Sequence, residues 1–373
     1  MKCQLQSVCP VHIGSGDSYG PSEYLPVTLT NKKGEKVKTF KRIDVSRYYI
    51  SLDESRRDEF ISELSRPDFN LKNFDTKISN TYRKYLAIDK TTSRPKVGQD
   101  IEETIKTLNK AYIPGSSIKG AIKTALLYNL FDFDDVDKVK RFINSKPWDF
   151  RREYNKFMDE FFAANGRGPS AQRDVLKFLQ VSDTSDAKQI GVYDIYSVMA
   201  AQFNGRNTNV PYRKNKSSRE ATISYFETVD AGNKLEFTIN NNYSENVHST
   251  VRFGNKLDLL DIDNIKKSIY NFSKDYIEHE LEFSDKYGID SLNAFYKRYS
   301  KMNTLDSPLL KVGAGSGFLA TTLAMKIEDY DPQLYDTIRR QKRGYEYSFP
   351  KSRKITKKDG RPLGWVKLSF DEE

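Results

Sequence analysis

The sequence contains few residues of the kinds that bind metals or form disulfides. Among 373 residues there are two cysteines, Cys3 and Cys9, and three histidines, and there is no CxxC pair. If both cysteines lie on one extended strand, they are too far apart to bond each other. A structural zinc site usually takes four Cys or His ligands. We therefore expect no bound metal, no cofactor and a reduced, cytoplasmic environment.

Long apolar runs and the common nucleotide motifs are also missing. No stretch of 18 apolar residues could cross a bilayer, and the N-terminus lacks the apolar segment of a signal peptide. We expect a protein that is neither exported nor embedded in a membrane. The pattern GxxxxGK[ST] is absent, which argues against ATP hydrolysis, and GAGSGF lacks the glycine spacing of a dinucleotide fingerprint.

Positive charge, by contrast, is abundant. The chain has 61 Lys and Arg against 51 Asp and Glu, a net charge of +10, and 37% hydrophobic residues, enough for buried cores. Residues 339–367 alone contain 11 basic and two acidic residues. Such a field attracts nucleic acid or another anionic surface. We expect this basic tail, which includes Arg353 and Lys354, to face a partner.

The N-terminal part of the chain predicts a strand, an insertion and a packed helix. Residues 3–13 alternate between apolar and polar positions, which predicts a strand with His12 on its polar face, followed by a flexible loop at 14–16. Residues 46–110 predict a mostly helical polar insertion. A helix with an apolar face follows from 115 to about 128, its face formed by Ile118, Ala121, Ile122, Ala125 and Leu126.

The remaining sequence alternates between helical and extended patterns. Helix is expected over 136–179 and 257–302, and a strand, glycine loop and helix over 309–327. Residues 203–220 are polar and basic and predict a mobile loop. Residues 221–239 predict a β-hairpin that turns at 231–233, and residues 364–370 predict a closing strand.

Three segments place small residues at the end of a strand or the start of a helix. They are His12-Ile13-Gly14-Ser15-Gly16, Pro114-Gly115-Ser116-Ser117 and Gly313-Ala314-Gly315-Ser316-Gly317. Glycine lets backbone N–H groups turn toward a ligand, and a helix N-terminus adds its dipole, so such segments bind phosphates. The alternative is three tight turns, for which glycine is the usual residue. Together, in a basic chain, the three segments favour phosphate.

Two lysines and one histidine extend this pattern. Lys119 and Lys123 lie in the first two turns of the expected helix, where the dipole disfavours cations unless an anion lies against them. They either contact phosphate or form a solvated helix face. His12 suggests catalysis, because metal-free ribonucleases use histidine as a general base. No second histidine is near it in sequence, so a histidine that is hydrogen-bonded or only contacts RNA is the alternative we favour.

The motifs resemble a known family. PVHIGSG, YIPGSSIKGAIKTAL, LQVSDTS, VGAGSGF, PKSRK and PLGWVKL, which span most of the chain, are similar to segments of the RAMP proteins of CRISPR systems. Within that family they resemble subunit five of the type III-A Csm effector complex. The resemblance implies an α+β fold of two RRM-like (ferredoxin-like) domains with helical insertions, with residues 1–200 in the first domain and 201–373 in the second.

The resemblance also implies a function. Members of the RAMP family hold crRNA through the sugar-phosphate backbone of the RNA. The subunit that this chain resembles caps the 3′ end of crRNA, beside the RAMP backbone subunit and the small helical subunit. Target RNA pairs with the guide in the same complex. The implied phosphate contacts come from His12, Gly14, Ser15, Gly16, Ser116, Ser117, Lys119, Lys123, Gly313, Gly315, Ser316 and Gly317, with Arg353 and Lys354 in the tail.

Two departures from the family pattern reduce the implied phosphate contacts. Lys123 stands where many members carry arginine, and Leu319-Ala320-Thr321-Thr322 follows the glycine loop where many carry a lysine. A lysine offers a point charge where arginine can form two bonds to a phosphate. The alternatives to a non-catalytic cap are a metal-independent endoribonuclease that processes precursor crRNA, and a scaffold that recruits host nucleases.

Overall fold

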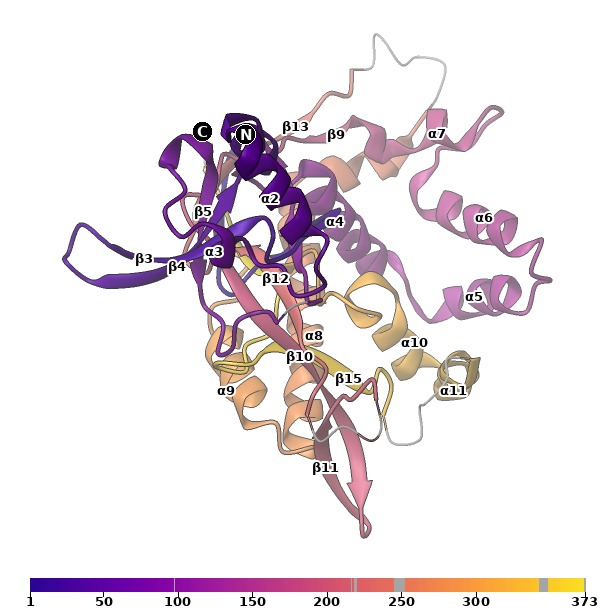
Figure 1. The fold of residues 1–373 in the computed structure, drawn as a ribbon. Helices are drawn as coiled ribbons and strands as arrows, with labels where there is room; N and C mark the ends of the chain where they lie inside the picture. The colour runs from indigo at the N-terminus through magenta and orange to yellow at the C-terminus, as the bar shows by residue number, and fades with distance from the viewer. Residues whose placement is uncertain (97, 216, 218–219, 245–251, 342–347, 372–373) are drawn as a thin grey trace.

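The computed structural model describes residues 1–371 except 97, 216, 218–219, 245–251 and 342–347. Two sheets lie side by side, with helices around them (Figure 1). The five-stranded sheet has the order β14 (Leu309–Lys311), β16 (Trp365–Phe370), β1 (Lys2–Ser7), β13 (Lys234–Asn241) and β9 (Leu179–Val181). The mixed α+β class expected from the sequence is confirmed, whereas the assignment of two RRM-like domains stays a prediction.

The second sheet has nine strands. Its main order is β2 (Gly14–Tyr19), β6 (Ile101–Thr104), β12 (Ser224–Val229), β10 (Ile190–Phe203), β5 (Arg83–Asp89), β4 (Lys36–Ile43) and β3 (Tyr24–Thr30), and β11 (Arg206–Pro211) and β15 (Ser352–Thr356) also pair with β10. The strands β7 (Lys106–Thr107) and β8 (Lys110–Ala111) form a small ribbon. The expected boundary at residue 200 falls inside β10, and both sheets take strands from either side of it.

The helices group by position along the chain. The N-terminal helices are α1 (Val45–Ser51), α2 (Glu54–Leu64) and α3 (Leu71–Phe74), and the central ones are α4 (Gly115–Leu130), α5 (Val136–Ile143), α6 (Phe150–Phe162) and α7 (Ser170–Arg173). The C-terminal helices are α8 (Ile262–Lys286), α9 (Asp290–Ser300), α10 (Ala324–Tyr330) and α11 (Pro332–Gln341). Short 3-10 turns are η1 (Asn80–Tyr82), η2 (Phe133–Asp135), η3 (Val175–Phe178), η4 (Gly254–Leu260) and η5 (Leu319–Thr321).

The main core is formed where α4 and α8 pack together and α8 packs against β14. The expected apolar face of α4 is confirmed, because Ile118, Ile122 and Ala125 are fully buried. Tyr128 on α4 packs edge-on against Phe272 on α8 with ring centroids 5.0 Å apart. This packing fixes the position of α4 relative to β14 and the glycine loop that follows it.

The N-terminal strand differs from its prediction. One strand was expected over 3–13, but β1 ends at Ser7, and Val11 pairs separately with Val229 of the other sheet. Pro10 lacks the N–H that a continuous ladder needs, so the chain crosses between the sheets at this point. The loop expected at 14–16 is also wrong, because these residues begin β2, in which Gly14 pairs with Thr104 of β6.

The insertion and the hairpin need corrections as well. Only the first half of 46–110 is helical, and its second half supplies β5 to β8, because β-branched residues such as Ile101 and Thr104 fit a pleated, buried surface. The expected hairpin at 221–239 is wrong: β12 pairs with β10 and β6, whereas β13 pairs with β1. The turn between them connects the two sheets, and Gly232 donates its N–H to Ser7 O at 2.7 Å.

The first part of the expected mobile loop at 203–220 is a strand, because β11 covers Arg206–Pro211. β10 and β11 form a ribbon that projects from the body (Figure 1) and turns at Asn204 and Gly205, whose φ angles are 48° and 75°. Residues 216 and 218–219 of that segment, and residues 342–347 of the basic tail, lie outside the described residues. In the part of the chain that the structure describes, no helix is long and apolar enough to cross a membrane.

Candidate nucleic-acid interface

Two of the three small-residue segments meet at the junction of the sheets. The Ala314 N–H donates to His12 O at 2.8 Å, so the glycine loop at 313–317 packs directly on the segment that leads into β2. At Gly313, φ is 70° and a Cβ would lie 2.3 Å from His12 O. Only glycine fits this position, because the positive φ and the close approach both exclude a side chain. The segments 12–16 and 313–317 therefore form one continuous surface.

The outer side of this surface is exposed backbone. Gly14, Ser15 and Gly16 are exposed, and so are Gly313 and Gly317. The Ser316 hydroxyl donates to Gly313 O at 2.7 Å, which holds the glycine loop in a tight turn. Exposed N–H groups beside glycines can approach an anionic backbone closely. Backbone with this geometry can contact phosphates at both segments.

His12 lies elsewhere than expected. It was expected on the polar face of a strand, but it is 3% exposed and its ring stacks on Phe226 at 4.7 Å between centroids. Nδ1 lies 2.7 Å from Glu227 O, and Nε2 lies 3.9 Å from a Glu102 carboxylate oxygen. Burial lowers the pKa of His12, and the Glu227 carbonyl opposes this effect. His12 is thus a buried histidine with a hydrogen-bonded ring, and its backbone rather than its side chain supports the surface.

The first N–H group of α4 is already paired within the protein. The Gly115 N–H donates to Asp183 Oδ1 at 2.8 Å, and a Cβ on Gly115 would lie 2.1 Å from Val181 O. Asp183 therefore caps the helix in the place where a phosphate was expected. Of the two serines, Ser116 is exposed and Ser117 is half-buried.

The negative charge beside Lys119 and Lys123 also comes from the protein itself, from the carboxylate of Asp174. Lys123 Nζ lies 3.3 Å from Asp174 Oδ2 and 4.8 Å from the centre of the Phe162 ring. Burial lowers the pKa of the neighbouring Lys119, and the charge of Asp174 opposes this effect. Lys123 thus already has an anionic partner within the chain, and its contact with a phosphate stays a prediction. Lys119 remains the lysine of this stripe that is better placed to contact an external anion.

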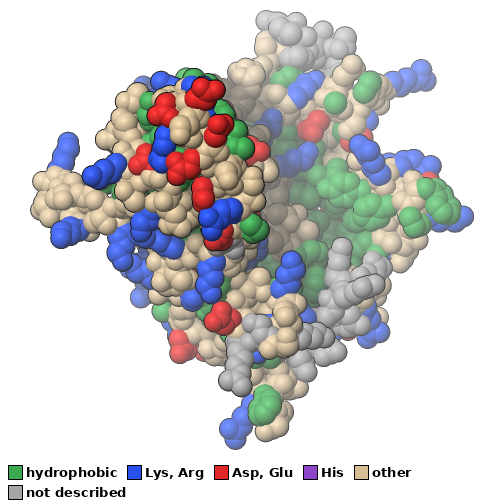
Figure 2. Space-filling model, in the orientation of Figure 1, with side chains coloured by type: hydrophobic (Ala, Val, Ile, Leu, Met, Phe, Trp, Pro, Cys, Tyr) green, Lys and Arg blue, Asp and Glu red, His purple; other side chains and the backbone are tan. Residues whose placement is uncertain are grey.

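A groove joins α4 to the end of the glycine loop. It has a volume of about 320 Å³ and is lined by Gly120, Lys123 and Thr124 of α4 and by Thr321 and Thr322. Figure 2 shows hydrophobic side chains gathered in the hollow between α4 and α6. The threonine hydroxyls donate to Gly317 O and Phe318 O, each at 2.7 Å. The groove thus places the middle of α4 beside the residues that follow the glycine loop.

Two neighbouring residues of the basic tail, Arg353 and Lys354, differ in their exposure. Lys354 is exposed, with Nζ 5.0 Å from the centre of the Phe226 ring. Arg353 was expected to contact RNA, but its Nε donates to both Glu280 carboxylate oxygens, at 2.7 and 2.9 Å, and its side chain is 10% exposed. The guanidinium therefore lies in a buried ion pair rather than on the outer surface, and its contact with RNA stays a prediction.

The sequence reasoning did not identify a cavity on the inner side of the glycine loop. Lys311, Tyr276 and Glu280 are among the residues that line it. The only signal was a lysine within the apolar strand Leu309-Leu310-Lys311-Val312. Among the described residues, no group of three or more His, Cys, Asp or Glu side chains is arranged to hold a metal.

The comparisons with known proteins agree with this architecture. A model of the RAMP superfamily matches residues 4–319. The chain belongs to the RAMP superfamily. The resemblance inferred from the motifs is therefore confirmed.

Two curated relatives of this RAMP protein are each described as CRISPR system Cms protein Csm5. The one from Methanocaldococcus jannaschii is 23% identical over 334 residues, which cover 87% of this chain and 72% of that protein. The one from Streptococcus thermophilus is 25% identical over 225 residues, which cover 52% of this chain and 59% of that protein.

Two solved structures share the fold of this RAMP protein. A chain in the cryo-EM structure of a Csm–crRNA–target RNA ternary complex of a type III-A CRISPR-Cas system has a TM-score of 0.69 and 20% identity, and the match covers 99% of this chain and 100% of that one. The crystal structure of T. onnurineus Csm5 has a TM-score of 0.61 and 18% identity, with 97% and 99% covered.

Proposed function

We propose that this RAMP protein is a non-catalytic RNA-binding subunit of a type III-A CRISPR effector complex. It holds the 3′ end of crRNA, supports its maturation and acts in the cytoplasm. Its partners are crRNA, target RNA paired to the guide, the RAMP backbone subunit and the small helical subunit. The similar chain in a Csm–crRNA–target RNA complex supports this proposal.

The observation that carries the proposal is the junction between the two glycine segments. The Ala314–His12 hydrogen bond holds exposed backbone from both ends of the chain on one surface, in a protein with a net charge of +10. Backbone N–H groups and lysines contact phosphates without reading bases. The surface therefore suits a guide whose sequence is read by base pairing rather than by the protein.

The main rival is a metal-independent endoribonuclease. Such an enzyme needs a general base within hydrogen-bond reach of a 2′-hydroxyl. The burial of His12 and the contact of its Nδ1 with Glu227 O support the non-catalytic alternative. Recruitment of host nucleases by the basic tail is a further prediction, and it does not require free RNA binding.

One experiment separates these functions. The full chain is mixed with end-labelled crRNA and its repeat-containing precursor in EDTA across a salt series, and gel shift and cleavage are both measured. We expect intact RNA and affinity that falls steeply with salt, because each neutralised phosphate of a single strand contributes about −0.7 to the slope of log K against log salt. Lys119→Ala should make that slope shallower by roughly 0.7 to 1.

Lys38→Ala is the matched control, because it removes the same charge from the exposed part of β4, far along the sheet from β2. It should leave the slope unchanged if the surface described above carries the binding. If Lys119→Ala and Lys38→Ala changed the salt slope equally, the protein would attract RNA nonspecifically through its overall positive charge. Site-specific cutting that is lost in His12→Ala would replace the proposal with the endoribonuclease, and assembly without RNA binding would replace it with the scaffold.

A further inference from the structure

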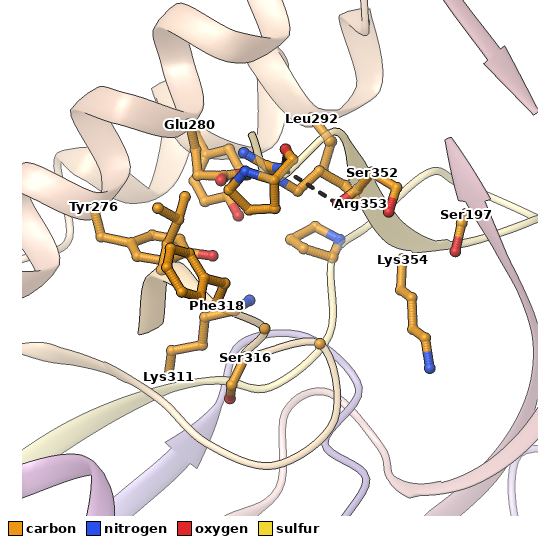
Figure 3. Close-up of a pocket in the computed structure, with 16 residues that line it drawn as sticks. Ser197, Tyr276, Glu280, Leu292, Lys311, Ser316, Phe318, Ser352, Arg353 and Lys354 are labelled. Carbon is orange, nitrogen blue, oxygen red and sulfur yellow. Dashed lines mark hydrogen bonds and ion pairs between the residues drawn. The ribbon is translucent and has the colours of Figure 1, made fainter. Parts of the chain in front are cut away.

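A cavity of about 350 Å³ lies on the inner side of the glycine loop (Figure 3). The loop residues from Gly315 to Leu319 form one wall, and α8, α9, β14 and β15 form the others. In Figure 3, Tyr276, Phe318 and Lys311 lie on one side of the cavity, Glu280 and Arg353 lie above, and Lys354 lies on the opposite side. The glycine loop thus contributes to the outer surface and also to one wall of the cavity.

The cavity is positively charged. Lys311, Arg353 and Lys354 line it, and among the described residues of the lining Glu280 is the one acidic residue. Lys311 is 5% exposed, and its Nζ donates to Leu363 O at 2.9 Å. Burying a charged group is costly unless it is paired, so this arrangement favours an anion that enters the cavity.

Hydrogen-bond donors in the cavity lack partners. A lysine ammonium has three donors, and the contact with Leu363 O uses one of them. Arg353 uses Nε for Glu280 and Nη1 for the carbonyls of Pro350 and Ser352, whereas its Nη2 is buried and has no hydrogen-bond partner among the described residues. A buried donor without an acceptor costs free energy, which a phosphate oxygen would recover.

Aromatic rings complete the lining. Tyr276, Tyr296 and Phe318 contribute to the walls, and Phe318, half-buried, belongs to the loop itself. Nucleobases stack on such rings whatever their identity, because each base has a π face. The volume lies at the lower end of the range of small-ligand pockets. Cationic donors beside aromatic rings in so small a space match one nucleotide rather than a longer strand.

We propose that this cavity binds a ribonucleoside phosphate, whose phosphate contacts Lys311 and Arg353 and whose base lies against Phe318. The source that we favour is the terminal nucleotide of the bound RNA, turned inward behind the glycine loop. The choice of an RNA end as the ligand rests on the function proposed above. The binding of a ribonucleoside phosphate in the cavity does not depend on that function.

The first test uses free nucleotides. The full chain is titrated by calorimetry with AMP, GMP, CMP and UMP, and then with inorganic phosphate as competitor. We expect saturable binding of the nucleotides that Lys311→Met weakens by about tenfold, the worth of one charge-assisted hydrogen bond. Lys326→Met is the matched control, because Lys326 also lies over tyrosine rings but on α10, outside the cavity lining. It should not change the affinity.

The second test asks whether the ligand is an RNA end. A linear RNA and a circular RNA of the same sequence are compared on wild type, Lys311→Met and Phe318→Ala, and each variant is first checked by thermal unfolding. We expect both variants to weaken the linear RNA by about tenfold more than the circular RNA. If Lys311→Met does not fold, Phe318→Ala alone decides.

The outcomes keep the two proposals apart. Equal effects of the variants on both RNAs, together with no saturable nucleotide binding, would overturn the cavity proposal while leaving the RNA-binding function intact. Absence of all RNA binding would overturn the function. In that case the free-nucleotide titration alone decides whether the cavity is a nucleotide site.

Discussion

The buried charge of Lys311 should make the stability of the protein depend on pH in a predictable direction. Burial lowers the pKa of Lys311 from 10.5 to about 8, and the neighbouring Cys9 and Glu280 oppose this effect. The perturbation is Lys311→Met, which removes the charge and keeps most of the side-chain volume. The comparison of the variant with wild type isolates the contribution of this single group.

The sign follows from proton binding. Below about pH 8 the lysine is protonated in both the folded and the unfolded chain, so the folded state bears the full cost of the buried charge. Between about pH 8 and 10.5 the unfolded chain binds more protons, so the free energy of unfolding rises with pH. The difference between the two pKa values corresponds to about 3 kcal/mol in total, of which about 1 kcal/mol is recovered between pH 7 and 9.

The assay is urea unfolding of both proteins at pH 7, 8 and 9, followed by tryptophan fluorescence, to which the buried Trp365 contributes. The free energy of unfolding of wild type minus that of Lys311→Met should rise by about 1 kcal/mol over this range. Groups that titrate equally in both proteins cancel in the difference. A difference that stays constant with pH would show that Lys311 keeps an ordinary pKa, and the reasoning about its burial would be wrong.

Two further predictions concern the contacts that replaced expected phosphate sites. Arg353→Met should destabilise the protein by about 3 to 5 kcal/mol, because it leaves the buried Glu280 carboxylate unpaired. The double variant Arg353→Met, Glu280→Met should be destabilised much less, because it removes both charges. Urea unfolding measures the free energy of unfolding of each variant. Asp183→Ala removes the acceptor for the Gly115 N–H, and a loss of about 1 kcal/mol is expected in the same assay. A loss well below that value would mean that water replaces the cap.

The parts of the fold that the sequence predicted are those with strong local patterns. The apolar face of α4, the long helices α8 and α9 and the closing strand β16 follow from periodicity alone. The β10–β11 ribbon was missed although it contains Asn204-Gly205, a dipeptide that favours a two-residue hairpin turn. The basic composition of the surrounding residues was taken as evidence for a loop, and the turn signal should have taken precedence.

The failures arose where pairing is not local. The runs that became β12 and β13 alternate like a hairpin, but each finds its partners in a different sheet, and no feature of the turn reveals that. The same holds for the site. Asp174 and Asp183, which occupy the positions expected for phosphate, lie 51 and 68 residues along the chain from the groups that they contact. Sequence spacing placed the lysines on α4 but could not reveal these distant carboxylate partners.

Leu363 contacts both Lys311 in the cavity and Gly315 in the glycine loop. Because of these two contacts, a circular RNA is the necessary control. Its carbonyl accepts from Lys311 Nζ, and a Cβ on Gly315 would lie 3.2 Å from the Leu363 Cβ. Lys311→Met therefore removes a contact that also supports the loop. A loosened loop weakens backbone contacts to any RNA, linear or circular, by the same factor. Only the loss of a terminal nucleotide from the cavity affects the linear RNA alone, so the ratio of the two affinities separates binding inside the cavity from support of the loop.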